Sequence, residues 1–131
     1  MYLLDTNICI AINNGDRPVI RQFSKNLSDC YINSVVLSEL YKGVFCSQQT
    51  ERNLAVLERL LLTLEIVDFA RSAALHFGQI QAELRRLGRP TGDLDAAIAA
   101  TARSRDDILV TNNTRHFENI LNLRLENWLF N

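Results

Sequence analysis

The chain has 131 residues, of which 47% are hydrophobic and 22% are charged. This composition is typical of a globular domain with its own core, and it excludes a mainly disordered, collagen-like or low-complexity chain. Fourteen Lys and Arg residues against 15 Asp and Glu residues give a formal net charge of −1. A nucleic acid would therefore need a local basic patch or metal ions to bind. We expect a single domain over residues 1–131.

The cysteines and the amino-terminal segment indicate the compartment. Cys9, Cys30 and Cys46 form neither a zinc-binding spacing nor a disulfide framework, which predicts a reducing compartment and small core side chains. The segment MYLLDTN lacks the basic and long apolar regions of a signal peptide. No apolar run approaches the roughly 18–20 residues of a membrane helix. We expect a cytoplasmic protein with no membrane partner.

Short apolar runs alternate with longer helical periods along the chain. The runs predicted to be buried strands cover residues 2–4, 30–33, 66–67, 108–111 and 123–125. Helices are predicted over residues 19–27, from Ser34 as N-cap, over 51–64, over 70–87, and from Asp93 as N-cap to 102. Strands connected by helices form parallel sheets covered on both faces, so the predicted fold class is α/β.

Acidic and amide side chains fall where these strands and helices meet. Asp5 closes the first strand, and Glu39 lies one to two turns into the helix after the second strand. Asp95 lies in the first turn of an Ala-rich helix, and Asn113 follows the strand over residues 108–111. Ligands of parallel sheets bind at the carboxyl ends of the strands, near a switch point in strand order. We therefore expect these side chains to converge at one edge of the sheet.

Three ionised carboxylates at such an edge repel one another, so that without a cation at least one has its pKa raised. A divalent cation removes this conflict, and a site rich in carboxylates but poor in His and Cys favours Mg²⁺ or Mn²⁺ over Zn²⁺. A metal held by acids with open water positions suits phosphodiester hydrolysis. The pattern favours such a site, with either one ion or two.

Four segments in this order resemble the PIN-domain ribonucleases, and among them the VapC-type toxins of bacterial toxin–antitoxin pairs. They are LLDTN at residues 3–7, SELYKG at 38–43, GDLDAAIAATA at 92–102 and ILVTNNTRHF at 108–117. The resemblance implies a PIN-like α/β/α sandwich with a small, mostly parallel central sheet. It also implies an endoribonuclease that depends on Mg²⁺ or Mn²⁺.

The same resemblance implies partners. A VapB-type antitoxin is expected to bind and block the toxin, and a toxin homodimer and a toxin–antitoxin hetero-oligomer are expected as well. Transfer RNA is the favoured substrate by analogy alone. Specificity for an RNA would come from its shape and its exposed loops.

Carried over to this chain, the acidic site consists of Asp5, Glu39 and Asp95. The resemblance implies that Asp5 and Asp95 are metal ligands and that Glu39 is a ligand or orients the attacking water. The family often has a fourth acid where this chain has Asn113, whose oxygen can ligate a metal but brings no charge. Asp93 and Glu118 are two alternatives for completing the site.

Polar residues next to these acids are predicted to support the site. Thr6 and Asn7 follow Asp5 and are expected to support the carboxylates or contact a phosphate. Thr111 and Asn112 are expected to hydrogen-bond the carboxylates.

Several of these residues have structural alternatives. Asp5 can simply cap a helix that begins near Thr6, and Asp93 is favoured as an N-cap over a metal ligand. Glu39 can be a surface acid paired with Lys42 or Arg52.

The basic residues at the end of the long helix have two interpretations. Arg85, Arg86 and Arg89 can bind RNA phosphates, or can form a solvated helix end that complements the helix dipole. His76 is predicted to be half-buried and structural, and His116 has no partner nucleophile in the sequence.

Two further apolar segments are expected to pack or to contact a partner. Trp128 and Phe130 are predicted packing anchors or a partner surface. The run at residues 60–62 has more Leu than one helix face needs, which predicts an interface for a dimer mate or the antitoxin.

Two rival functions remain. A phosphotransfer enzyme of the haloacid-dehalogenase type also has an Asp after the first strand, but it needs a second Asp where this chain has Asn7. The stronger alternative is a non-catalytic PIN fold that binds RNA or protein, which only Asn113 favours.

Overall fold

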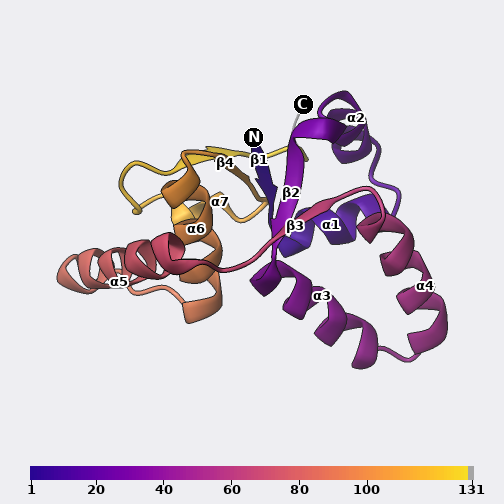
Figure 1. Ribbon diagram of the computed structural model, residues 1–131, viewed down its shortest axis with the longest axis horizontal. Coiled ribbons are helices and arrows are strands. Elements are labelled where there is room, and N and C mark those ends of the chain that lie inside the picture. Colours follow the sequence, from indigo (N-terminus) through magenta and orange to yellow (C-terminus); the bar gives the residue numbers. More distant parts are fainter. Residues whose placement is uncertain (130–131) are drawn as a thin grey trace.

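A computed structural model describes residues 1–129, which form a five-stranded parallel sheet between two sets of helices (Figure 1). Its strands are β1 (Tyr2–Leu4), β2 (Cys30–Asn33), β3 (Glu65–Val67), β4 (Ile108–Val110) and β5 (Arg124–Glu126). The strand order is β3-β2-β1-β4-β5, and every neighbouring pair is parallel. The predicted α/β class is confirmed, and the five strands lie within one residue of their predicted bounds.

The helices separate by sequence into two groups. They are α1 (Thr6–Asn13), α2 (Arg17–Lys25), α3 (Ser34–Phe45), α4 (Thr50–Leu61), α5 (Arg71–Arg86), α6 (Asp93–Arg105) and α7 (Thr114–Phe117). Figure 1 shows α1 to α4 on one side of the sheet and α5 and α6 on the other. This is the sandwich that the resemblance implies.

The chain path places β1 at a switch point. From β1 the chain moves outward to β2 and β3, and then returns to the other side of β1 as β4 and β5. Leu4 at the end of β1 is in register with Val110 at the end of β4. The next residues, Asp5 and Thr111, therefore leave the sheet side by side at the edge where parallel α/β folds bind ligands.

The core lies between the short strands and the inward faces of the helices on both sides of the sheet. Leu3, Ile32 and Leu109 are fully buried in β1, β2 and β4. Helix α6 is buried along Ala96–Ala102, and its small side chains let it approach close to its neighbours. This packing fixes the first turn of α6, which carries Asp95.

Two predicted helix caps are wrong by one residue. The side chain of Asn33, not of Ser34, caps α3, because Asn33 Oδ1 accepts from the Val36 N–H at 2.8 Å. The N-cap of α6 is Gly92, and Asp93 is the first helical residue. Sequence reasoning also missed α7 and left α1 as a loop or helix start, because both helices are short.

Two of the three cysteines and Trp128 are buried in the core. Cys9 and Cys30 are buried, as predicted, but Cys46 is exposed just after α3, so the prediction that it is a core residue is wrong. Trp128 is buried and is confirmed as a packing anchor. Phe130 lies outside the described residues.

The apolar run at the end of α4 is only partly buried. Leu60 is 6% exposed, whereas Leu62 is 88% exposed. The predicted interface at this run stays a prediction. Within residues 1–129 no helix is long and apolar enough to cross a membrane.

Candidate active site

Asp5 is both a helix cap and the most enclosed acid of the site. Its Oδ1 accepts from the Thr6 N–H at 2.8 Å, which caps α1. Its Oδ2 accepts from the Thr111 hydroxyl at 2.8 Å and from Asn7 Nδ2 at 3.2 Å. The residue is only 4% exposed. The structural and functional interpretations of Asp5 are therefore not exclusive.

The pKa of the Asp5 carboxyl is raised above its ordinary value. Burial is the main cause, because it penalises the charged form. The hydrogen bonds from Thr111 and Thr6 lower the pKa, and the charges of Asp95 and Glu39 raise it again. The pKa of one carboxyl is raised, as predicted, but burial is a larger cause than repulsion by the neighbouring carboxylates.

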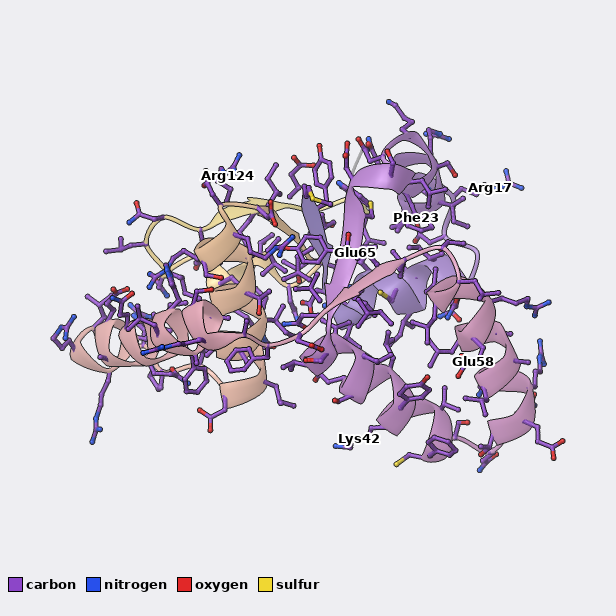
Figure 2. All side chains as sticks on the ribbon, viewed as in Figure 1. Arg17, Phe23, Lys42, Glu58, Glu65 and Arg124 are labelled. Carbon is purple, nitrogen blue, oxygen red and sulfur yellow. The ribbon has the colours of Figure 1, made fainter. Side chains whose placement is uncertain are left out.

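Glu39 points from the middle of α3 toward the beginning of α1. Its Oε1 accepts from the Thr6 hydroxyl at 2.7 Å, and the residue is half-buried. Neither Lys42 nor Arg52 forms an ion pair with it in the described structure, and Lys42 projects from α3 into solvent (Figure 2). The alternative of a surface ion pair is therefore wrong.

Asp95 has a partner that sequence reasoning missed. Its Oδ2 lies 3.2 Å from Nδ1 of His116, which is on α7. His116 had no predicted partner because α7 was not predicted, and its 21-residue separation from Asp95 carries no helical signal. The other histidine, His76, is half-buried and accepts from Arg103 Nε at 2.9 Å, as expected of a structural residue.

The amide side chain of Asn7 ties the first turn of α1 to the loop after β4. The Asn112 N–H donates to Asn7 Oδ1 at 3.0 Å, and the Asn113 N–H donates to Thr111 Oγ1 at 3.0 Å. Thr111 thus supports Asp5 directly, as predicted. Asn112 acts through its backbone and contacts Asn7, so its predicted bond to a carboxylate is not found.

One open hollow collects the side chains that the sequence singled out. It has a volume of about 260 Å³ and is lined by Asp5, Thr6, Asn7, Ile10, Glu39, Asp95, Asn113 and His116. All three predicted acids come together here, and Asn113 occupies the rim where a fourth acid was considered. The topology therefore brings together residues up to 111 positions apart (Asp5 to His116) at one edge of the sheet.

Neither alternative for a fourth acid lies in this hollow. Asp93 instead accepts from Gln81 Nε2 at 3.0 Å, and Glu118 is exposed beyond the end of α7. Arg85 and Arg86 are exposed on α5 and do not line it either. Arg89 lines a neighbouring hollow that shares Asp95 and His116.

The donor set of the acidic hollow fits a hard cation. It offers carboxylate, amide and hydroxyl oxygens from Asp5, Glu39, Asp95, Asn113 and Thr6. Within residues 1–129 no three His, Cys, Asp or Glu side chains are arranged to hold an ion by themselves. Mg²⁺ commonly uses one or two carboxylates and keeps several waters, so this set suits Mg²⁺ or Mn²⁺ better than Zn²⁺.

The fold and the site together define an α/β protein with an acidic pocket at the switch point of a parallel sheet. The sequence model of the PIN domain matches residues 2–121. The chain therefore belongs to the PIN domain family, which confirms the resemblance.

Individual relatives match nearly the whole chain. The chain is 49% identical over 128 residues to a protein from Shigella flexneri named tRNA(fMet)-specific endonuclease VapC, with 97% of each chain covered. The crystal structure of DNA-bound VapBC from Salmonella typhimurium is 45% identical, with a TM-score of 0.93 and 97% of each chain covered. That of VapBC2 from Rickettsia felis, bound to a promoter DNA fragment, has a TM-score of 0.92 at 38% identity, covering 97% of this chain and 98% of that one.

Proposed function

We propose that this chain is a divalent-metal-dependent endoribonuclease and the toxin of a toxin–antitoxin pair. The observation that carries the proposal is the meeting of Asp5, Glu39 and Asp95 at one hollow on the switch point of the sheet. The relatives named ribonuclease or endonuclease VapC support hydrolysis of RNA as the reaction. Transfer RNA is the proposed substrate class, since a relative at 49% identity is named for it.

The proposed cofactor is Mg²⁺ or Mn²⁺, held by Asp5 and Asp95 with Glu39 and Asn113 nearby. When bound, such an ion supplies a more acidic water and neutralises charge on the phosphate. Asp5 is held rigid by three hydrogen bonds. A cation beside it also relieves the cost of burying its charge.

The other side chains of the hollow have separate roles in the proposed reaction. The Thr6 hydroxyl fixes one oxygen of Glu39, which leaves the other free to orient the attacking water and accept its proton. Asn113 contributes an amide without charge at the rim of the same hollow. The expected products carry a 5′-phosphate and a 3′-hydroxyl.

The proposed partner is a VapB-type antitoxin. The support is that solved structures similar to this chain are VapBC complexes, two of them bound to DNA. A homodimer of the toxin, and a hetero-oligomer with the antitoxin, are proposed on the same ground. A toxin must be blocked in the cell that makes it, so purified toxin has to be freed of antitoxin before it is assayed.

The test is cleavage of total bacterial RNA by the purified chain with Mg²⁺ or Mn²⁺. We expect discrete fragments that disappear with a chelator and with Asp95→Asn, and that persist with the control Asp106→Asn, whose side chain is 93% exposed. The fragment ends would identify the RNA that is cut.

Other outcomes separate the alternatives. Cleavage that survives in Asp95→Asn would contradict the assignment of the site. Absence of both cleavage and Mn²⁺ binding would favour the non-catalytic PIN fold, with Asn113 as the first residue to examine.

A further inference from the structure

A second hollow adjoins the acidic one. Its walls come from the end of α5, the loop between α5 and α6, and helix α7, and its volume is about 320 Å³. Asp95 and His116 line both hollows, so this pair forms the wall between them. A flexible ligand that occupies the acidic hollow can therefore extend over this wall into the second one.

The second hollow is basic. Arg89 and Arg115 line it, and both are exposed. No ion pair of the described residues involves either of them. Asp95 is the one carboxylate among the described lining residues, and it faces His116. Two guanidinium groups are thus left available to an anion, beside a site whose proposed substrate is a polyanion.

The backbone of Arg89 is fixed by the end of α5. Gly88 has a φ of +65°, a left-handed conformation that favours glycine. The Gly88 N–H donates to the Arg85 carbonyl at 3.1 Å, and the Arg89 N–H donates to the Leu84 carbonyl at 2.9 Å. These two bonds form a Schellman motif, which ends the helix and sets the direction of the following residue. Arg89 is therefore placed at the hollow by a defined turn.

The position of Arg115 depends on the acidic site itself. Helix α7 starts directly after Asn113, whose N–H is held by the Thr111 hydroxyl at 3.0 Å, and the same hydroxyl binds Asp5. The His116 N–H donates to the Asn113 carbonyl at 3.0 Å. The helix that carries Arg115 and the carboxylate of Asp5 are consequently positioned by one connected set of hydrogen bonds.

We propose that this basic hollow, defined by Arg89 and Arg115, binds the RNA phosphate adjacent to the scissile phosphate. The proposal rests on the proposed ribonuclease function and adds a subsite to it. A guanidinium group presents a planar pair of N–H donors that matches phosphate oxygens. Interactions of this kind position an RNA strand and carry no sequence information.

The charge of the chain supports a nucleic acid backbone as the occupant. With a net charge of −1 the protein has no general field that attracts RNA. The acidic hollow repels a phosphate until a cation is present, so an adjacent pair of arginines supplies the attraction that the site itself lacks. The sequence offered three arginines for phosphate binding, and of these only Arg89 lines the basic hollow. Arg115, which the sequence did not single out, lines it as well, whereas Arg85 and Arg86 do not.

The first test measures binding without cleavage. A labelled single-stranded oligoribonucleotide is titrated in chelator with the full chain and with Arg89→Gln, Arg115→Gln and the double variant. Arg21→Gln, an exposed residue on α2, loses the same charge and is the control. We expect each of the two substitutions in the basic hollow to weaken RNA binding about tenfold, and the control substitution to leave RNA binding unchanged.

Salt dependence gives an independent readout. Every phosphate that a protein neutralises on a single strand adds about 0.7 to the steepness with which log K falls against log salt. We expect this steepness to decrease by about 0.7 in the double variant, as for one phosphate, and to stay unchanged in Arg21→Gln. Mn²⁺ should still bind all of these proteins, because neither arginine lines the acidic hollow.

The second test locates the phosphate. A neutral methylphosphonate is placed next to the cleavage site of the oligonucleotide. We expect the methylphosphonate to weaken binding to the wild-type chain. It should not weaken binding to the double variant, because the arginines that would contact the missing phosphate charge are already absent there.

Unchanged RNA affinity and salt dependence in the double variant would overturn the proposal. So would loss of binding to an acidic peptide with RNA binding intact, since the hollow would then be a protein site. If the wild-type chain binds no RNA at any salt concentration and cuts none with Mn²⁺, the proposed function itself fails.

Discussion

The Thr111 hydroxyl donates a 2.8 Å hydrogen bond to Oδ2 of Asp5, and this bond joins the ends of β4 and β1. The two residues directly follow the register pair Leu4 and Val110, so the parallel sheet itself sets them face to face. Both are buried. Even with this bond, burial keeps the pKa of Asp5 above its ordinary value of 3.8. A residue proposed to bind metal therefore destabilises the metal-free fold when it is ionised.

Asp5→Asn should make the metal-free protein more stable at neutral pH while it abolishes cleavage. Because the pKa of Asp5 is raised in the folded state, its ionised form is favoured by the unfolded chain. The folded wild-type protein accordingly loses stability as the pH rises through that pKa. The gain from Asp5→Asn should be small below pH 3.8 and larger at neutral pH, measured by urea unfolding in chelator.

Asp106→Asn is the matched control, because its side chain is 93% exposed and its unfolding should change little at either pH. Added Mn²⁺ should stabilise the wild-type chain, by about 2.7 kcal/mol at a hundredfold excess over its Kd, and should not stabilise Asp5→Asn. An Asp5→Asn protein that is less stable than wild type at neutral pH in chelator would contradict this account.

Thr6 should act as a positioning residue for Glu39. Its hydroxyl donates to Glu39 Oε1 at 2.7 Å, and Thr6→Val removes this bond while it keeps the side-chain volume. A hydrogen bond to a charged group contributes about 1.5–3 kcal/mol, which predicts a fall in kcat of roughly tenfold or more. Thr6→Ser keeps the hydroxyl and should retain most of the activity.

Steady-state cleavage separates this role from direct binding of the substrate. If Thr6 positions Glu39, Thr6→Val should lower kcat and leave KM nearly unchanged. A rise in KM with kcat preserved would show instead that Thr6 binds RNA directly.

The sequence predicted the strands and the three acids because both have local signals. Residues 30–33 and 108–110 are short apolar runs, Asp5 directly follows a strand, and Asp95 lies in the first turn of a helix. The parallel direction of the strands required only that helices connect them, whereas their order, β3-β2-β1-β4-β5, was not predicted. The meeting of Asp5, Glu39 and Asp95 in one hollow then followed from the topology.

The features that were missed depend on tertiary contacts. Helix α7 has four residues and no periodicity to detect, so the contact of His116 with Asp95 could not be foreseen. The caps of α3 and α6 were misplaced because Asn33, Ser34, Gly92 and Asp93 all suit a cap by residue type. Which of two suitable neighbours becomes the cap is decided by the strand or loop that leads into the helix.

Asp107 should stabilise the fold in a pH-dependent manner, opposite in sign to Asp5. Burial opposes its ionisation, but hydrogen bonds from Tyr31 Oη at 2.6 Å, the amino-terminal ammonium and Arg105 outweigh burial and lower its pKa. This stability is present above the unfolded-state pKa of 3.8 and is lost as the pH falls through the folded-state pKa.

Asp107→Asn should therefore cost about 1–3 kcal/mol of unfolding free energy at neutral pH. The difference from wild type should shrink when urea unfolding is repeated below pH 3.8. Asp29→Asn, an exposed acid just before β2, provides a comparison that should be nearly neutral. A cost that is independent of pH would mean that Asp107 acts through packing and not through its charge.

Ala99→Leu should disturb the site through packing alone. Ala99 is fully buried on α6, the helix whose first turn carries Asp95. Extra methylene groups in a filled core typically cost about 1–3 kcal/mol and shift the backbone. Ala82→Leu adds the same atoms to an exposed position on α5 and should be nearly neutral. If chemical denaturation shows equal stability for the two variants, α6 does not pack as tightly as its run of small residues indicates. If Ala99→Leu is destabilised and also binds Mn²⁺ more weakly, the position of Asp95 depends on how deeply α6 packs.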